Sequence, residues 1–266
     1  PLIKKQTGEI VPVYEIGDSK ESWGDSLTTG MKAWYEGKDI KFDYSKLRLA
    51  GERLKTMGGR SSGPEPLRAL LDFTRFKILS RQGKRLRNID VHDIICKIGE
   101  VVVMGGVRRS ALISLSDLDD EEMRHSKEGQ FYLNEPQRQM ANNSAVYNQK
   151  PSAAEFMEEW LALAKSGTGE RGIFNRGGLE SQLPERRWKV FAKDAATAGT
   201  NPCGEIILKS KQFCNLTEVI ARAEDTEETL LRKTRLAAIL GTYQSTLTNF
   251  PYISKEWKKN CEEERL

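Results

Sequence analysis

The feature that most constrains the fold is an alternation between helical patterns and short apolar runs along the 266-residue chain. Apolar residues recur at helical spacing in some segments, and short runs between them have the character of buried strands. This alternation predicts an α/β fold with a parallel sheet, either open or closed into a barrel, and periodicity leaves both forms open. The predicted helices occupy residues 23–35, 65–78, 90–101, 152–164 and 225–240, and the predicted strands residues 111–115, 172–175, 205–208 and 216–220.

Several element ends carry local signals. Ser152 and Glu155 have the spacing of a capping box, and Asp90 is predicted to be the N-cap of its helix. The remaining predictions are a β-hairpin over residues 3–16, a short element over residues 44–54, a glycine-rich loop over residues 57–64 and a capped helix start at residues 225–228.

Charge and cysteine content exclude several classes of protein. The 42 basic and 38 acidic residues leave a formal charge of only +4, so the chain is not predicted to coat a polyanion. No run approaches the roughly 18 apolar residues of a membrane span, and no signal-peptide pattern opens the chain. The 4 cysteines include no CxxC pair, and His92 and His125 are far apart, so neither a metal site nor a disulfide scaffold is predicted. We therefore expect a cytoplasmic enzyme with thiol chemistry.

The motif Asn-Pro-Cys-Gly-Glu at residues 201–205 places an amide, a thiol and a carboxylate at alternate positions. Alternate side chains of a strand share one face, so Asn201, Cys203 and Glu205 would point toward one small volume. The proline fits poorly inside a regular strand, and a strand end or loop tip is expected there. Cys214 follows eleven residues after Cys203. The alternative is a buried loop cysteine with an incidental amide and acid beside it.

Three further segments offer groups that bind phosphates or sugars. Glycines allow a close approach of backbone to ligand, and hydroxyls, guanidinium groups and amides supply hydrogen bonds. Each segment is also compatible with a plain loop or turn. The residues concerned are Ser61, Ser62 and Gly63 in the first segment, Arg108 and Arg109 in the second, and Asn142, Asn143 and Ser144 in the third. Cys96 is interpreted as a core residue, and Cys261 as incidental.

Taken in order, seven segments of the chain resemble the catalytic subunit of the class II ribonucleotide reductases, the adenosylcobalamin-dependent type. Each segment alone is a weak signal, whereas their shared order and the cysteine spacing make the resemblance specific. The proline of the cysteine motif and the paired arginines are closer to class II than to class I, where a leucine and Arg-Gly-Gly are usual. The segments are Gly17–Trp23, Gly59–Pro64, Gly105–Ala111, Asn142–Ser144, Gly172–Asn175, Asn201–Glu205 and Cys214–Leu216.

The resemblance implies reduction of ribonucleotides to 2′-deoxyribonucleotides for DNA precursor synthesis, by thiyl-radical chemistry with adenosylcobalamin as cofactor. Cys203 resembles the cysteine whose sulfur radical abstracts the 3′ hydrogen of the ribose. Glu205 resembles the carboxylate that deprotonates the 3′ hydroxyl, and Asn201 the amide that binds the substrate hydroxyls. Cys214 resembles one half of the dithiol that delivers the reducing electrons and ends as a disulfide.

For the other segments, the resemblance implies roles in nucleotide recognition. Ser61–Gly63 and Asn142–Ser144 would lie near the substrate. Asp18 and Ser19 resemble residues near the specificity effector site, and Arg108–Arg109 fall in the loop that communicates effector identity to base choice. The implied partners are a ribonucleotide substrate, a dNTP effector, a thioredoxin-like reductant and the remaining segments of the reductase. No membrane and no direct nucleic-acid partner is expected.

The fold that the resemblance implies is a ten-stranded α/β barrel, shared with glycyl-radical enzymes and built from two five-stranded halves. Residues 1–266 are expected to form only part of it, because the family's early redox cysteine and its C-terminal cysteine pair have no counterpart here. We therefore expect this chain alone not to turn over, whether it is a split piece or an incomplete gene product. The alternative is a non-catalytic nucleotide-binding remnant, which would tolerate changes at Cys203 and Glu205.

Overall fold

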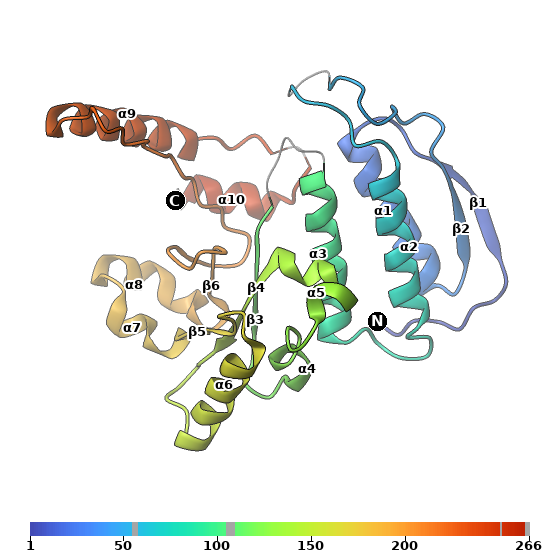
Figure 1. The fold of residues 1–266 in the computed structure, drawn as a ribbon, viewed down its shortest axis with the longest axis horizontal. Helices are drawn as coiled ribbons and strands as arrows, with labels where there is room; N and C mark the ends of the chain where they lie inside the picture. Colours follow the sequence, from blue (N-terminus) through green and yellow to red (C-terminus); the bar gives the residue numbers. More distant parts are fainter. Residues whose placement is uncertain (55–57, 105–109, 251, 264–266) are drawn as a thin grey trace. The chain divides into compact units, whose positions relative to one another are not determined.

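The computed structural model describes residues 1–54, 58–104, 110–250 and 252–263, and the chain divides into two compact units. Unit 1 comprises Pro1–Val146 and Pro151–Phe174, and unit 2 comprises Tyr147–Lys150 and Asn175–Leu266. Figure 1 follows the chain through the strands and long helices of unit 1 to the helices of unit 2. Strands and helices alternate through unit 1, which confirms the predicted α/β class.

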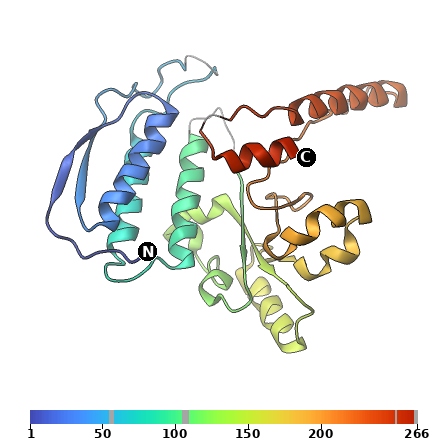
Figure 2. The same cartoon turned by 180° about the vertical axis from the view of Figure 1, so that it is seen from behind.

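Unit 1 begins with a parallel β–α–β arrangement (Figure 2). β1 (Ile10–Glu15) and β2 (Asp39–Asp43) pair in parallel, and α1 (Lys20–Tyr35) connects them. Parallel strands cannot be joined by a tight turn and need a crossover of this kind. The predicted hairpin over residues 3–16 is wrong, because β1 takes β2 as its partner and Ile3 is buried in the core instead.

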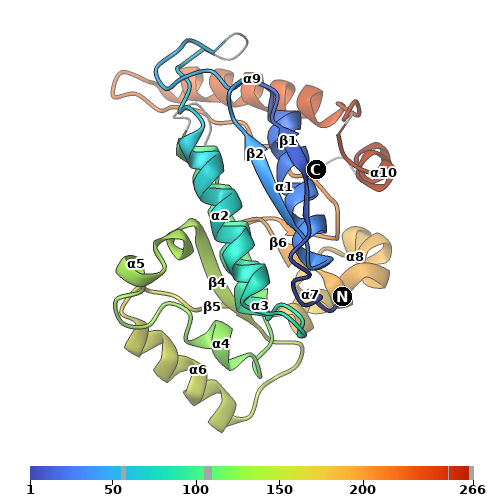
Figure 3. The same ribbon diagram turned by 90° about the vertical axis from the view of Figure 1, so that its right-hand side faces the viewer.

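Three long helices of unit 1 pack side by side (Figures 1 and 3). α2 (Glu65–Leu79) lies between α1 and α3 (Asn88–Met104). Trp34 of α1 and Leu67 and Ile78 of α2 are buried in one apolar cluster between these elements. The apolar spacing that predicts the first two helices therefore marks the faces that they turn to the core.

The start of α3 differs from the prediction. The helix begins at Asn88, so Asp90 lies within its first turn and is not the N-cap. The carboxylate of Asp90 accepts a hydrogen bond from the backbone N–H of Arg87 (3.0 Å) and pairs with the guanidinium of the same residue (2.8 Å). An acidic side chain at this end is favourable because the first N–H groups of a helix are free.

The second sheet of unit 1 contains the parallel strands β3 (Leu112–Ser116), β4 (Ala141–Val146) and β5 (Gly172–Phe174), in that order. α6 (Ala153–Ser166) connects β4 to β5, and the predicted capping box at its start is confirmed. Within the described ranges β3 and β5 are edge strands and the sheet stays open, as expected for part of a barrel. Shorter helices of unit 1 are α4 (Glu121–Arg124), α5 (Phe131–Asn134) and the 3₁₀ helix Pro136–Met140.

Unit 2 is mostly helical. Its only described sheet is the antiparallel pair β6 (Gly199–Thr200) and β7 (Ile207–Leu208), so the predicted strand over residues 205–208 is shorter than expected. The helices are α7 (Leu179–Gln182), α8 (Glu185–Phe191), α9 (Glu227–Ser245), α10 (Lys255–Glu263) and the 3₁₀ helices Arg176–Gly178 and Ala192–Thr197.

Two predicted elements are absent. Residues 216–220 do not form a strand, and Leu216 and Ile220 are exposed. This segment instead bonds to α9 through Thr217, whose hydroxyl donates to the carbonyl of Ala237 (3.0 Å). Among the described residues of the stretch 44–54 there is likewise no helix or strand ladder, although the helix cap predicted at residues 225–228 is confirmed at Thr226.

Candidate active site

The motif at residues 201–205 forms the tip of the β6–β7 hairpin in unit 2. Two reciprocal hydrogen bonds close this tip: the backbone N–H of Asn201 donates to the carbonyl of Ile206 (3.2 Å), and the N–H of Ile206 donates to Oδ1 of Asn201 (3.0 Å). Gly204 has a φ of +85°, which glycine adopts without steric cost. The expected loop tip is therefore confirmed, while a regular strand through all five residues is not formed.

The turn brings the amide and the carboxylate of the motif together. Nδ2 of Asn201 donates to Oε1 of Glu205 at 2.5 Å, and Asn201 is only 7% exposed. Both ends of this amide are therefore fixed. Cys203 stands between the two residues as an exposed free thiol. One short loop thus combines an accessible sulfur, an oriented amide and a carboxylate that can accept a proton.

Cys214 lies in the same unit, on an irregular segment that follows the hairpin, and its free thiol is half-buried. The preceding residue, Phe213, packs against Phe250 and Trp257, with ring centroids 5.0 and 4.7 Å apart. The segment that carries the second predicted thiol is therefore packed against the last helix of unit 2.

In unit 1, the predicted effector and substrate segments line one cavity of about 250 Å³. Asp18 and Ser19 contribute to its wall together with Ser61 and Ser62. Arg48 lines the same cavity, and its Nη2 lies 2.7 Å from Oδ2 of Asp18. The structure thus joins two segments that are far apart in sequence. Arg48 is absent from the sequence prediction, because no local pattern marks a single arginine whose partner is 30 residues away.

Gly63 shapes the loop that carries the two serines. Its φ is +74°, and a Cβ at this position would lie 3.0 Å from the backbone nitrogen of Ala50. Its N–H donates to Oγ of Ser61 at 3.0 Å. Gly63 therefore allows a close approach of two backbone segments, which is a shaping role next to the cavity.

The third predicted substrate segment lies on β4, where its side chains are divided between two environments. Asn143 is 3% exposed, its Nδ2 donates to Oγ of Ser126 (2.7 Å), and its Oδ1 lies 3.2 Å from Nε2 of His92. Ser144 is also buried, whereas Asn142 is exposed. Asn143 therefore connects β4 to Ser126 and to His92 of α3 inside unit 1. Asn142 is the member of the three that faces outward.

Arg108 and Arg109 lie outside the described residues. Across the ranges that the structure does describe, no group of three or more His, Cys, Asp and Glu side chains could hold a metal ion. None of the helices in the described part is both long and apolar enough to cross a membrane.

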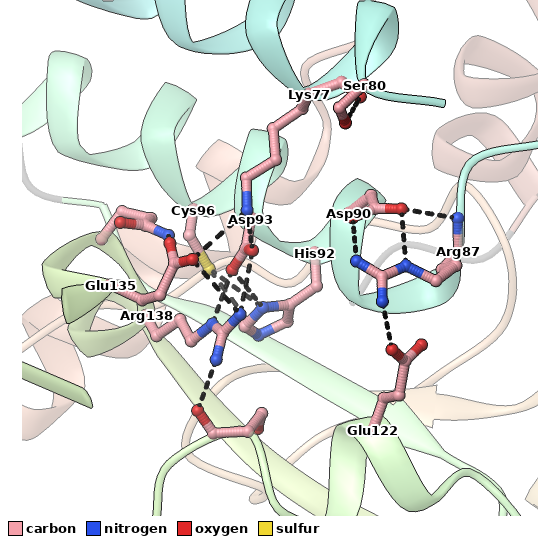
Figure 4. A network of polar contacts seen from close by, with 12 residues as sticks. Lys77, Ser80, Arg87, Asp90, His92, Asp93, Cys96, Glu122, Glu135 and Arg138 are labelled. Atoms are coloured by element: carbon pink, nitrogen blue, oxygen red, sulfur yellow. Dashed lines mark hydrogen bonds and ion pairs between the residues drawn. The ribbon is translucent and has the colours of Figure 1, made fainter. Parts of the chain in front are cut away.

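A buried polar network links the helices of unit 1 (Figure 4). Asp93 is fully buried and lies 2.7 Å from both Nζ of Lys77 and Nε of Arg138. Burial alone would raise the pKa of Asp93, but hydrogen bonds from His92, Arg138 and Lys77 outweigh it and hold the pKa well below its usual range. Cys96 lies on the same helix and is buried, as predicted for a core residue, and burial raises its pKa to about 12.

This network makes the stability of unit 1 dependent on pH. A carboxyl whose pKa is lowered by folding stabilises the fold above its unfolded pKa of about 3.9, and that contribution disappears as pH falls. We expect Asp93→Asn to be less stable than the wild type by about 2 kcal/mol or more at pH 7, with a difference that shrinks between about pH 5 and pH 2. Urea unfolding at several pH values measures it, with the exposed Asp25→Asn as control. A difference that does not vary with pH would contradict this assignment.

Comparison with known proteins finds relatives of this chain. No family model matches the chain. The adenosylcobalamin-dependent ribonucleoside-triphosphate reductase of Euglena gracilis is 31% identical over 255 residues, which is 94% of this chain and 33% of that protein. The enzyme of the same name from Lacticaseibacillus paracasei is 38% identical over 228 residues, 81% of this chain and 29% of that protein.

A solved structure agrees with the sequence matches. The crystal structure of a B12-dependent, class II ribonucleotide reductase superposes with a TM-score of 0.61 at 25% identity, over 77% of this chain and 28% of that one. The resemblance found in the sequence is therefore confirmed. This chain is a relative of the class II, adenosylcobalamin-dependent ribonucleotide reductases, and it spans about a third of the length of the curated relatives that it matches.

Proposed function

We propose that this chain supplies the thiyl-radical centre of a reductase that converts ribonucleotides to 2′-deoxyribonucleotides. The observation that carries the proposal is the hairpin tip, where an exposed thiol stands between an amide and a carboxylate that are hydrogen-bonded to each other. The relatives are named for ribonucleoside triphosphates, and we infer the same substrate class for the complete enzyme.

The chemistry starts and ends at the sulfur of Cys203. As a thiyl radical, this sulfur takes the 3′ hydrogen atom of the ribose and later returns it to the same carbon. The transfer is reversible because the S–H and C–H bonds are of similar strength. Glu205 accepts the proton of the 3′ hydroxyl while the 2′ hydroxyl takes up a proton and leaves as water. Nδ2 of Asn201 donates one of its two hydrogens to Glu205, and the second would donate to a substrate hydroxyl.

Reduction also needs two electrons and two protons from a pair of thiols, which become a disulfide. Cys214 is the proposed first member of that pair. Cys96 is unsuited to the task, because burial raises its pKa to about 12 and leaves the thiol both protonated and inaccessible. We infer that the second thiol comes from another segment of the reductase, and that a thioredoxin-like protein reduces the disulfide in the cytoplasm, where thiols are kept reduced.

The relatives and the solved structure are named for adenosylcobalamin or B12, and we propose the same cofactor. The observation that supports this is the exposure of Cys203 at the hairpin tip, which leaves its sulfur accessible, so that it would face the cofactor. When bound, adenosylcobalamin supplies an organic radical through homolysis of its cobalt–carbon bond. The hairpin holds the thiol at the surface, and the hydrogen bond from Asn201 fixes the carboxylate of Glu205 in the same loop.

The cavity of unit 1 suits recognition of the dNTP effector. The carboxylate of Asp18 is paired with Arg48 and would accept an additional hydrogen bond from the hydroxyl of a deoxyribose. Ser19 caps the start of α1 by accepting the N–H of Ser22 (3.1 Å). Because Ser61 and Ser62 line the same cavity, an effector bound at Asp18 would alter the loop proposed to lie near the substrate. Arg108 and Arg109 are proposed to carry that effect further.

The role of Glu205 gives a direct test of the proposed function. In a complete reductase that contains this chain, Glu205→Gln should lower kcat by about 10²–10⁴-fold, the usual contribution of a general base. Substrate affinity should change little, because glutamine keeps the hydrogen bond with Asn201. Glu218→Gln, an exposed residue beyond Cys214, is the matched control. Equal turnover of Glu205→Gln and the control would favour the non-catalytic nucleotide-binding remnant.

A further inference from the structure

The turn just before Cys214 has an unusual backbone. Lys211 has a φ of +59° and is the only non-glycine residue with a positive φ among the described residues. An amino acid with a Cβ adopts this conformation at a steric cost, and such residues persist only where their surroundings hold them. The contacts that hold this turn therefore also determine where the chain continues toward Cys214.

A buried amide of α10 holds the turn from one side, beside an ion pair between Lys211 and Glu256 of the same helix and a hydrogen bond from the N–H of Lys209 to the side chain of Gln212 (3.0 Å). Nδ2 of Asn260 donates to the carbonyl oxygens of Ser210 (3.0 Å) and Lys211 (2.9 Å), and Asn260 is only 8% exposed on α10. Both hydrogens of the amide are thus used on two successive carbonyls. Side chains of this kind usually satisfy polar groups of their own helix or solvent, whereas Asn260 reaches 49 residues back along the chain to Lys211.

α10 also packs against Phe213, the residue next to the thiol. Trp257 lies one helical turn before Asn260 and packs on Phe213, with ring centroids 4.7 Å apart. Beyond Cys214, the hydroxyl of Thr217 donates to α9. Cys214 therefore sits between two anchoring points, and the one on its N-terminal side is made by α10.

We infer that Asn260 is a positioning residue for Cys214: it locks the turn at Ser210–Lys211 and so fixes the half-buried thiol. The catalytic meaning of this rests on the proposed function of Cys214, while the positioning itself is a property of unit 2. Asn260 is not expected to touch substrate or cofactor. It acts through the backbone that leads to the thiol.

Thiol labelling tests the inference without any need for catalysis. The purified, reduced chain is treated with iodoacetamide, and the rate at each cysteine is followed by peptide mass spectrometry. Asn260→Asp is nearly isosteric but loses the donor hydrogens, and we expect the rate at Cys214 to rise about fivefold or more, since losing one or two hydrogen bonds shifts a local equilibrium by that order. Lys259→Gln, on the exposed face of α10, changes the charge equally and should leave the rate unchanged.

The other cysteines serve as internal references. Exposed Cys203 and buried Cys96 and Cys261 should keep their wild-type rates in Asn260→Asp. Asn260→Gln retains the donor amide and should give a rate at Cys214 between those of the wild type and Asn260→Asp. An unchanged rate at Cys214 would overturn the inference, and so would a parallel rise at Cys261, because α10 itself would then have come loose.

The positioning of Cys214 by Asn260 and the proposed redox role of Cys214 can fail independently of each other. If Cys214→Ser retained turnover in the complete reductase, the proposed role of Cys214 would fail while positioning by Asn260 stood. If the labelling rates were unchanged in Asn260→Asp, positioning would fail while the role of Cys214 stood.

Discussion

In a complete reductase that contains this chain, Cys203→Ser is expected to abolish nucleotide reduction, whereas Cys214→Ser should still form the radical but lose turnover with a dithiol. A serine hydroxyl cannot replace the thiol, because its O–H bond is too strong for a carbon-centred radical to break, so no hydrogen-accepting radical forms at residue 203. The loss for Cys203→Ser should reach at least about 10⁶-fold, the lower end of the acceleration that enzymes provide. Cys214 acts after hydrogen abstraction, so its removal interrupts a later step.

Deoxyribonucleotide formation with an excess of dithiol measures both variants. Cys261→Ala is the matched control, because Cys261 is a buried cysteine of the same unit without a proposed chemical role. It should retain most of the wild-type turnover. Turnover near the wild-type level in either variant would contradict its proposed role, and equal radical formation in both variants would contradict the distinction between the two thiols.

The second large effect concerns the stability of unit 1. Glu159 is buried between two arginines: its Oε2 accepts from Nε of Arg171 (2.6 Å), and its Oε1 accepts from Nε of Arg124 (2.8 Å). Arg171 also donates to Oγ of Ser116 at the end of β3 (2.6 Å), so this cluster ties α4 and α6 to the sheet. Removing this carboxylate takes away the anionic partner of the buried Arg171, whereas Arg124 keeps an ion pair with Glu121.

We therefore expect Glu159→Gln to lower the free energy of unfolding by about 3–5 kcal/mol, the usual cost of breaking a buried ion pair. The neighbouring Glu158 is exposed on the same helix, and Glu158→Gln should change stability by less than about 0.5 kcal/mol. Urea unfolding of the two variants gives the comparison. A loss at Glu159 below about 1 kcal/mol would show that the pairs behave like surface salt bridges.

The elements that could be predicted from sequence are those specified by neighbouring residues. The capping box at Ser152 fixes the start of α6 within a few residues, and the apolar spacing of α1 and α2 marks their buried faces. The loop tip follows in the same way from Pro202, which fits poorly inside a regular strand. Local chemistry is sufficient in each of these cases.

The misplaced elements depend on distant partners. β1 has the pattern of a hairpin strand, yet it pairs in parallel with β2, and the backbone of Ile3 bonds instead to Gly83 and Lys84. Arg48 and Asn260 have no sequence signal at all, since their partners Asp18 and Lys211 become neighbours only in the folded chain. The resemblance indicated residues such as Asn143, but only the structure shows that its amide binds Ser126 within unit 1.

Electron paramagnetic resonance of rapidly frozen samples tests the central claim most directly, namely that the radical resides on Cys203. The complete reductase is mixed with adenosylcobalamin and a ribonucleoside triphosphate and frozen within the first turnover. The wild type and Cys214→Ser should both give a radical signal that depends on the cofactor, and Cys203→Ser should give none. A signal of wild-type intensity in Cys203→Ser would contradict the account.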